Sequence, residues 1–301
     1  MANRSALVTG GTGFVGSHLV RKLSAERWDV HMLVREGQQA QSLRGLPHVT
    51  VHQTALTIES VASIMGKVMP QVIFHLAALF VVDHKPEQIV PLIESNVLLG
   101  SLLLEAMSMH KVSRMVNVGT AWQNFQDADY SPVCLYAATK QAFEAVLHFY
   151  AEARGIQAIT LKLFDTYGPE DPRMKLFQVL RKAAASGQVL DFSPGEQTIS
   201  LVYVDDVVKA LLMAAEVYRP QGVQINETYA VNADEAITLR HLLALYAELI
   251  GKALNIRWGA RPYRDREMMT PWSKGKRLPG WSPRISLAEG IRRMEGLGES
   301  K

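Results

Sequence analysis

Short apolar runs and longer amphipathic stretches alternate along the first half of the chain. Short, continuously apolar runs are typical of buried strands, and apolar residues three and four apart are typical of helices. Strands are expected at residues 5–9, 30–34, 48–52, 71–76, 114–118 and 158–163. Helices are expected between them, at residues 14–26, 58–68, 87–110 and 133–154. Strands that alternate with helices imply an α/β fold with a parallel, doubly wound sheet covered on both faces.

The first strand leads directly into a glycine-rich turn. Gly10 permits the tight turn, Gly13 lets phosphate groups approach the backbone, and Gly16 lets the next helix pack closely. Backbone N–H groups where that helix begins, at Phe14 and Val15, can receive a pyrophosphate. Because the glycines stand between strand and helix at the start of a βαβ unit, they predict a Rossmann-type, dinucleotide-binding fold.

Further along the chain the regular alternation stops. Helices are expected at residues 175–186, 205–218 and 239–250, with short strands at 201–204 and ending at 230–232. Two aspartates begin the helix at residue 205, and a carboxylate is expected to cap it. The tail from Ile256 is predicted to be basic and loop-rich. We expect a dinucleotide-binding domain at 1–168, with parts of about 199–232, and a smaller C-terminal substrate-binding lobe mainly at 169–301.

Composition narrows the class of protein. The 301 residues are 48% hydrophobic and 20% charged with a net charge of +3, as in an ordinary globular protein without a basic tail for nucleic acid. Cys134 is the single cysteine, so an internal disulfide is excluded and a reducing compartment is expected. No apolar stretch is expected to approach the ~20 residues of a membrane span. A strand begins almost at once, so we expect a cytoplasmic protein without a signal peptide.

Tyr136 and Lys140 stand four residues apart in the helix expected at 133–154, and therefore share one face of it. A free tyrosine titrates near pH ~10, and a neighbouring ammonium group is expected to lower that pKa. Such a tyrosine can act as a general acid or base. The same spacing also occurs by chance on amphipathic helices, so the pair alone does not decide the function.

A series of motifs extends over nearly the whole chain. In order, they are Thr9–Gly16, His75–Ala78, Asn96-Val97, Thr120, Tyr136-x-x-x-Lys140, Tyr167–Pro169, Val204–Asp206 and Leu278–Pro283. Together they resemble the extended short-chain dehydrogenases/reductases of the nucleotide-sugar epimerase/dehydratase group. The resemblance implies an NAD(P)-dependent enzyme acting on a nucleotide sugar, with no metal ion. It also implies a homodimer formed through the helices at 87–110 and 133–154.

The resemblance assigns roles to particular residues. Thr120 would hydrogen-bond the sugar carbonyl or hydroxyl, Tyr136 would be the acid/base, and Lys140 would lower its pKa and bind the nicotinamide ribose. Asn96 would have a structural role near the active-site loop. The expected cofactor-binding residues are Gly10, Gly13, Phe14, Val15, Gly16, Arg35, Leu76, Ala77, Ala78, Tyr136, Lys140 and Thr166.

The chain departs from this group directly after Thr120. The 4,6-dehydratases of the group carry Asp-Glu there, because they must eliminate water from the sugar. This chain has Ala121 and Trp122, neither of which can transfer a proton. A dehydratase is therefore disfavoured, and hydride transfer at one carbon remains, either within an epimerase or as a net ketone reduction.

Position 35 bears on the cofactor. NAD-preferring members carry an acid at the end of the second strand to hold the ribose 2′-hydroxyl. Arg35 would instead attract a 2′-phosphate, or it is simply a solvated surface arginine. The acidic pair usual after the third strand is also missing, since residues 53–56 read Gln-Thr-Ala-Leu. NADP(H) is therefore favoured, with NAD(H) possible.

Substrate contacts are expected from residues on both sides of the catalytic helix. The candidates are Thr120, Ala121, Trp122, Asp165, Arg173, Arg261 and Arg266. Asp165 replaces a common asparagine and would meet sugar hydroxyls or a loop backbone, whereas the arginines are candidates for a diphosphate or are solvated loop charges.

The run at 164–173 and the tail resemble 4-keto-deoxy nucleotide-sugar reductases of the CDP-abequose synthase type. The predicted function is NADPH-dependent reduction of the C4 keto group of a nucleoside-diphosphate 4-keto-6-deoxy sugar. The alternatives are an NAD-dependent nucleotide-sugar 4-epimerase and a non-catalytic dinucleotide-binding sensor.

Overall fold

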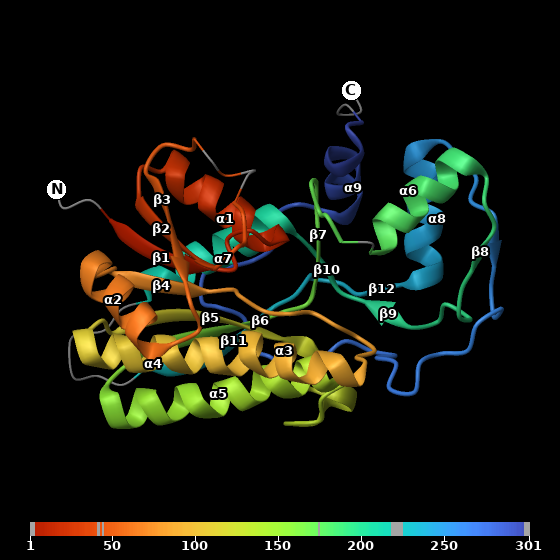
Figure 1. The fold of residues 1–301 in the computed structure, drawn as a ribbon. Helices are drawn as coiled ribbons and strands as arrows, with labels where there is room; N and C mark the ends of the chain where they lie inside the picture. Colours follow the sequence, from red (N-terminus) through yellow and green to blue (C-terminus); the bar gives the residue numbers. More distant parts are fainter. Residues whose placement is uncertain (1–3, 41–42, 44, 174, 218–224, 298–301) are drawn as a thin grey trace.

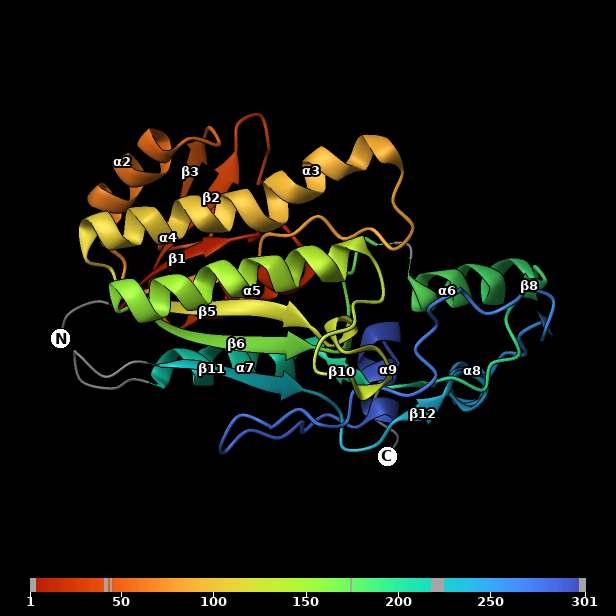
Figure 2. The ribbon, with the colours of Figure 1, turned by 90° about the horizontal axis from the view of Figure 1, so that it is seen from below.

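The structure is a computed structural model that describes residues 4–40, 43, 45–173, 175–217 and 225–297. Its main sheet has seven strands in the order β11-β6-β5-β4-β1-β2-β3, and every pairing in it is parallel (Figures 1 and 2). The strands are β1 (Ser5–Thr9), β2 (Asp29–Arg35), β3 (Val49–Thr54), β4 (Val72–His75), β5 (Arg114–Thr120), β6 (Gln157–Leu163) and β11 (Asn226–Val231). The predicted α/β, doubly wound parallel sheet is therefore confirmed.

Helices cover both faces of this sheet (Figure 1). One face carries α1 (Phe14–Ala25) and α7 (Val204–Glu216), and the other carries α2 (Ile58–Val68), α4 (Leu99–His110) and α5 (Leu135–Arg154). Alternate residues of a strand point to opposite faces. In β1, Ala6 and Val8 accordingly join one buried apolar cluster and Leu7 joins the other. Burial on both faces explains why the central strands β1 and β4 are mostly apolar.

The strand order alone indicates where a ligand would bind. The chain runs from β1 outward through β2 and β3, and then crosses back to lay β4 on the other side of β1. At such a reversal, the connections leave the carboxyl ends of the two central strands in opposite directions and open a crevice. The turn after β1 and the segment after β4 border this crevice.

The long helix expected at 87–110 is a composite helical run. A 3₁₀ turn (η2, Pro86–Gln88) leads into α3 (Ile89–Ile93), a π-helical segment (η3, Glu94–Leu98) and then α4. The π segment carries Asn96, which is fully buried. Its side chain accepts the N–H of Leu79 at 2.7 Å and donates to the Leu79 carbonyl at 3.1 Å. It also donates to Thr139 Oγ1 at 2.9 Å. Asn96 thus holds the segment after β4 against α5, the structural role predicted for it.

By length and composition, the run Pro86–His110 could cross a membrane. The expectation that no apolar stretch approaches a membrane span is therefore wrong. In this fold one side of the run is in the interior, where Leu103, Leu104 and Met107 are fully buried in the cluster shared with α2 and α5. That burial makes this side part of the protein core.

A second group of elements follows β7 (Asp165–Tyr167) and lies beside the main sheet, at the right of Figure 1. Its helices are α6 (Leu176–Ser186), α8 (Leu239–Ile250) and α9 (Leu287–Glu295), which share an apolar cluster. Its strand pairs are β7–β10 (Leu201–Tyr203), β8 (Leu190–Asp191)–β13 (Ile256–Arg257) and β9 (Thr198–Ile199)–β12 (Ile237–Thr238). The division into two domains at residue 168 stays a prediction.

Helix α9 falls in the tail that was expected to be loop-rich. Its sequence is strongly charged and has Gly290 near its middle, two features that weaken a helix signal. The structure supplies the reason for the glycine, because a Cβ atom there would collide with the Tyr167 hydroxyl. Packing against β7 and β10 therefore explains a residue that local propensity disfavours.

Asp206 does not cap α7, contrary to expectation. The N-cap is Tyr203, and the helix begins one residue before the aspartates. The Asp206 carboxylate instead accepts the backbone N–H groups of Arg284 and Ile285, both at 2.9 Å, and its carbonyl accepts Trp281 Nε1 at 3.0 Å. Two motifs some 75 residues apart in the chain are thus one structural unit. The predicted end of this helix, Tyr218, lies outside the described residues.

Other boundaries differ by one or two residues. Helix α5 begins at Leu135 rather than at residue 133, with Cys134 as its N-cap in an extended conformation. Strand β5 continues to Thr120, two residues beyond the expected end. Thr120 is therefore the last residue of a sheet strand, and Tyr136 lies in the first turn of α5.

Candidate active site

The glycine turn forms an open cradle at the start of α1. Gly10 has a φ of 71°, and a Cβ atom on it would lie 2.6 Å from the backbone N of Ala77. A Cβ atom on Gly16 would collide with the Gly10 carbonyl, so the close approach is between the helix and the turn itself. At Gly13 the nearest atom to a Cβ would be the Gly10 oxygen at 3.2 Å. A Cβ atom on Gly13 would therefore contact that oxygen tightly and no other atom within 4 Å, and it would fill the space beside the turn.

The first turn of α1 suits an anionic ligand. Its N-cap is Gly13, which has no side chain to bond the first N–H groups, and the turn contains no acidic residue. Unpaired N–H groups and the helix dipole together favour a phosphate there. The residues present therefore fit the pyrophosphate of a dinucleotide, held by backbone groups that include those of Phe14 and Val15.

A buried hydrogen-bond network joins the ends of β1 and β4. Thr9 Oγ1 lies 2.8 Å from His75 Nδ1, and it accepts the N–H of Ala77 at 3.3 Å. His75 is fully buried, and its Nε2 has no partner among the described residues. Burial, together with the positive charge of Lys140, lowers the pKa of His75 to about 3. His75 is therefore a neutral structural residue beneath Leu76, Ala77 and the cradle.

This burial predicts acid sensitivity. An unfolded histidine takes up a proton near pH ~6.5, whereas folded His75 does so only near pH 3, so stability falls as the pH drops through this window. Between pH 7 and 5 the expected loss is about 2 kcal/mol. In His75→Gln, which cannot titrate, that part of the loss should disappear. Urea unfolding at both pH values measures it, and an equally steep decline in the variant would contradict the assignment.

Thr120 is held at the end of β5 by a capping box. Its N–H donates to Gln123 Oε1 at 2.9 Å, and its Oγ1 accepts the N–H of Trp122 at 3.3 Å. Because the hydroxyl oxygen is the acceptor in that bond, its own hydrogen can be donated to another oxygen. The side chain is almost buried, at 8% exposure. The Thr120 hydroxyl can thus donate a hydrogen bond, which is what its predicted role would require.

Tyr136 and Lys140 are both buried on the inner face of α5, with exposures of 9% and 1%. The expectation that Lys140 lowers the pKa of Tyr136 is wrong for this structure. Burial raises the pKa of Tyr136, Cys134 adds to the rise, and the charge of Arg173 opposes it. Burial also lowers the pKa of Lys140 to about 8, against the charge of Glu144. Tyr136 is therefore a protonated phenol near neutral pH, and Lys140 is mostly an ammonium ion.

An aromatic ring packs against the Tyr136 side chain. Phe80, from the segment after β4, packs edge-on against Tyr136 with 4.9 Å between centroids and lies 5.6 Å from Trp122. Lys175 Nζ lies 5.0 Å from the Phe80 ring centre on another side. Sequence reasoning did not identify Phe80 or Lys175, since neither belongs to a motif. Their roles become visible only when loops from different strands meet.

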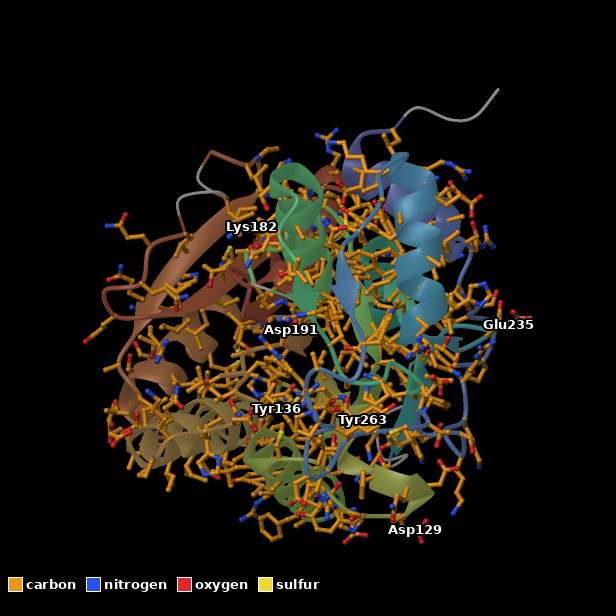
Figure 3. The ribbon with its side chains drawn as sticks, turned by 90° about the vertical axis from the view of Figure 1, so that its right-hand side faces the viewer. Asp129, Tyr136, Lys182, Asp191, Glu235 and Tyr263 are labelled. Carbon is orange, nitrogen blue, oxygen red and sulfur yellow. The ribbon has the colours of Figure 1, made fainter. Side chains whose placement is uncertain are left out.

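A cleft of about 1380 Å³ opens between the sheet edge and the C-terminal elements. It is lined by six of the seven candidate substrate residues, namely Ala121, Trp122, Asp165, Arg173, Arg261 and Arg266. Thr166 lines it as well. The lining residues do not include Thr120, Tyr136 or Lys140. Cys134 and Leu135, which directly precede Tyr136, do line the cleft. Figure 3 looks in from this side and shows Tyr136 of α5 with Asp191 and Tyr263 of the C-terminal elements.

The three candidate arginines have different surroundings. Arg173 forms a bidentate pair with Asp171, both contacts being 2.6 Å, and its guanidinium lies 4.9 Å from the centre of the Phe14 ring. Arg266 donates to Ser131 Oγ at 2.6 Å. Arg261 is exposed at the cleft. Arg173 therefore lies where the cleft meets the start of α1, with its charge already shared by a carboxylate.

Asp165 is half-buried in the cleft wall, at the start of β7. Burial raises the pKa of its carboxyl group, while the nearby charges of Lys175 and Arg173 lower it. Lys175 is also half-buried, and burial lowers its pKa. A carboxyl group and an amino group therefore line the same cleft, and together they offer hydrogen-bond acceptors and donors to a polyhydroxylated ligand.

Arg35 is exposed at the end of β2, opposite Thr54 of β3. The segment that follows it folds over the glycine turn, because Gln38 Nε2 donates to Thr12 Oγ1 at 2.7 Å. Arg35 thus stands at the edge of the cradle, where a ribose beyond the pyrophosphate would lie. Among the described residues, no group of three or more His, Cys, Asp or Glu could hold a metal ion.

A glycine cradle and a buried Tyr/Lys helix meet at the carboxyl edge of a doubly wound sheet, which makes this chain an NAD(P)-dependent enzyme of the extended short-chain dehydrogenase/reductase class. Residues 6–231 match the NAD dependent epimerase/dehydratase family. The chain belongs to that family, and the resemblance inferred from its motifs is confirmed.

Curated relatives and solved structures agree with this assignment. A CDP-abequose synthase of Yersinia pseudotuberculosis is 27% identical over 88% of this chain and 90% of that protein. A UDP-glucose 4-epimerase of Thermotoga maritima, solved with UDP-glucose, has a TM-score of 0.84 at 24% identity, covering 97% of this chain and 98% of the other. A UDP-glucose 4-epimerase of Thermus thermophilus, solved with NAD, has a TM-score of 0.79 at 26% identity with the same coverage.

Proposed function

We propose that the protein reduces the C4 keto group of a nucleoside-diphosphate 4-keto-6-deoxy sugar with NADPH. The cleft would hold the nucleotide sugar and the cradle the dinucleotide. A reduced nicotinamide, when bound, supplies the hydride that adds to the carbonyl carbon. Tyr136 donates its phenolic proton to the carbonyl oxygen, Thr120 hydrogen-bonds that oxygen, and Lys140 binds the nicotinamide ribose. The ketone thereby becomes a hydroxyl group.

Trp122 is the observation that argues against a dehydratase and leaves hydride transfer at a single sugar carbon. Elimination of water across two sugar carbons requires side chains that remove one proton and deliver another. Ala121 and Trp122 follow Thr120 in the chain and line the cleft. Neither a methyl group nor an indole ring can remove or deliver these protons. The similarity to CDP-abequose synthases over most of the chain supports the reductase in particular.

The phenol form of Tyr136 is the form that reduction of a ketone requires. Reduction needs a phenol that gives up a proton, whereas an epimerase begins by removing a proton from a sugar hydroxyl. Burial keeps Tyr136 in its phenol form. The second candidate is nevertheless an NAD-dependent nucleotide-sugar 4-epimerase, which the structural similarity to UDP-glucose 4-epimerases supports.

A panel of nucleoside-diphosphate 4-keto-6-deoxy sugars, assayed by the loss of NADPH absorbance, tests the proposal. Stoichiometric NADPH consumption with at least one member supports the reductase. Interconversion of UDP-sugars by protein that carries oxidised NAD, without added NADPH, would instead identify the epimerase. Dinucleotide binding without turnover of any sugar would point to a sensor.

Arg35 is proposed to select NADPH. Arg35→Asp removes the charge that would meet the 2′-phosphate and introduces an acceptor for a 2′-hydroxyl. The ratio of kcat/KM for NADPH to that for NADH should fall at least tenfold, or ~1.4 kcal/mol. Arg27→Asp is the matched control. Arg27 is exposed and lies just before β2 begins, at the other end of that strand from Arg35. An unchanged ratio in Arg35→Asp would show that Arg35 is not the selector.

Homodimerisation is proposed through the helical run 86–110 and α5. Large apolar side chains are exposed on these elements, including Val90 at 64%, Met109 at 57% and Phe149 at 54%. An apolar surface of this kind is typical of an interface between subunits. Sedimentation velocity of the purified chain measures the state. The proposed compartment is the cytoplasm, where a dinucleotide and a nucleotide sugar are both present.

A further inference from the structure

A buried acid lies between two lysines below the active site. Glu144 is on α5, one turn beyond Lys140, and its side chain is only 13% exposed. Lys162 of β6 approaches it from the sheet, with Nζ 3.9 Å from Glu144 Oε2 and 3.0 Å from Asn124 Oδ1. Gly119 leaves room for this group, because a Cβ atom there would lie 2.7 Å from Glu144 Oε1. The lack of a side chain at Gly119 of β5 therefore makes room for the Glu144 carboxylate beside the sheet.

A hydrogen-bonded chain connects this carboxylate to Thr120. Glu144 Oε1 accepts Gln123 Nε2 at 2.9 Å, and Gln141 Oε1 accepts the same amide at 2.7 Å. Gln123 is fully buried, and its Oε1 accepts the Thr120 N–H at 2.9 Å. With both amide hydrogens committed to α5, Gln123 must present its oxygen to Thr120. Glu144 thus orients the amide that fixes the backbone of Thr120.

The same carboxylate acts on Lys140. Lys140 is one turn away on the same helix and almost completely buried. The titratable groups around it are Glu144 on α5, Lys162 behind Glu144 on β6, and His75 on β4, which burial keeps neutral. Burial raises the pKa of Glu144, while the charge of Lys162, the hydrogen bond from Gln123 and the charge of Lys140 lower it. Toward the cleft, Arg173 is the nearby charge that acts on Tyr136. Glu144 is therefore the acid whose charge raises the Lys140 pKa and opposes the effect of burial.

We propose that Glu144 is a positioning residue with two effects, holding Thr120 in place through Gln123 and keeping Lys140 protonated under Tyr136. The inference rests on the proposed keto-sugar reduction for its kinetic readout. The protonation of Lys140 can be measured without any substrate.

Glu144→Gln tests the effect on charge, because the new amide oxygen can still accept a hydrogen bond from Gln123. In protein carrying lysine labelled with ¹³C at Cε, an NMR titration gives the pKa of Lys140, which is about 8 in the wild-type structure. The variant should show a pKa lower by about one unit. The alkaline limb of its kcat profile should move to lower pH by a similar amount. An unchanged pKa would overturn this half of the inference.

Gln123→Met tests the link to Thr120 and leaves the Glu144 charge in place. We expect kcat to fall by on the order of tenfold to 100-fold with KM for dinucleotide unchanged, and the Lys140 pKa to stay at or near its wild-type value. Wild-type kcat in this variant would overturn the link. If Glu144→Gln folds poorly, Glu144→Asp replaces it. This variant keeps the charge and shortens the side chain, so it should reproduce the Gln123→Met result.

Glu152→Gln is the matched control. It makes the same chemical change on the same helix, two turns further on, where Glu152 is exposed and pairs with His148 at 3.3 Å. It should leave both the pKa of Lys140 and kcat unchanged. A wild-type enzyme that turned over no keto sugar would contradict the proposed function, while the NMR titration would still decide the role of Glu144.

Discussion

Tyr136→Phe is expected to lower kcat for keto-sugar reduction by at least about 1000-fold, because the variant has no proton to donate to the developing alkoxide. Dinucleotide affinity should change little, since phenylalanine keeps the ring that packs against Phe80. Single-turnover kinetics at saturating substrate, together with fluorescence titration of NADPH, separate the two effects.

Tyr150→Phe is the control for this experiment. Tyr150 lies on the same helix and loses the same atom, but its hydroxyl donates to Glu105 of α4 at 2.6 Å. Its kcat should equal that of the wild type. If Tyr136→Phe kept a tenth or more of the wild-type kcat, another residue or water would have to be the proton donor.

Two alanine substitutions in the glycine turn should separate the effect on dinucleotide binding from the effect on stability. Gly13→Ala places a methyl group in the open space beside the first N–H groups of α1, where its nearest neighbour is 3.2 Å away. Dinucleotide affinity should fall at least tenfold, or ~1.4 kcal/mol, with a smaller loss of unfolding free energy than in Gly16→Ala. Isothermal titration calorimetry and urea unfolding measure the two quantities.

Gly16→Ala should damage both properties. Its methyl group would collide with the Gly10 carbonyl, so α1 must move away from the turn. Overpacking of this kind costs roughly 1–3 kcal/mol of stability, and the displaced helix would no longer direct its N–H groups into the cradle. Full affinity in Gly13→Ala would contradict the placement of a pyrophosphate there, and full stability in Gly16→Ala would contradict the close approach.

The pKa of Tyr136 could not be predicted from the spacing of residues in the sequence. A four-residue spacing puts Tyr136 and Lys140 on one face of a helix, which holds in the structure. Whether the ammonium lowers the phenol pKa depends on how far each group is removed from water. Burial raises the pKa of Tyr136 and lowers that of Lys140, and neither burial can be read from the spacing.

Several features follow from the sequence because short segments carry them. Apolar runs and helical periodicity predicted the parallel sheet and most of its helices, since burial on both faces leaves a local pattern. The glycine turn predicted the cradle, because only glycine suits the positive φ of Gly10 and the close packing at Gly16. The motif series identified the family.

Only the tertiary structure decided how distant segments meet. Asp206 looked like a helix cap and instead binds the backbone at Arg284 and Ile285. Phe80 and Lys175 reach the site from loops that lack a motif, and Glu144 lies beneath it one turn past the catalytic pair. These roles depend on contacts between residues far apart in the chain and on exclusion of water. Neither leaves a periodic trace in the sequence, so the cradle was predictable and the surroundings of Tyr136 were not.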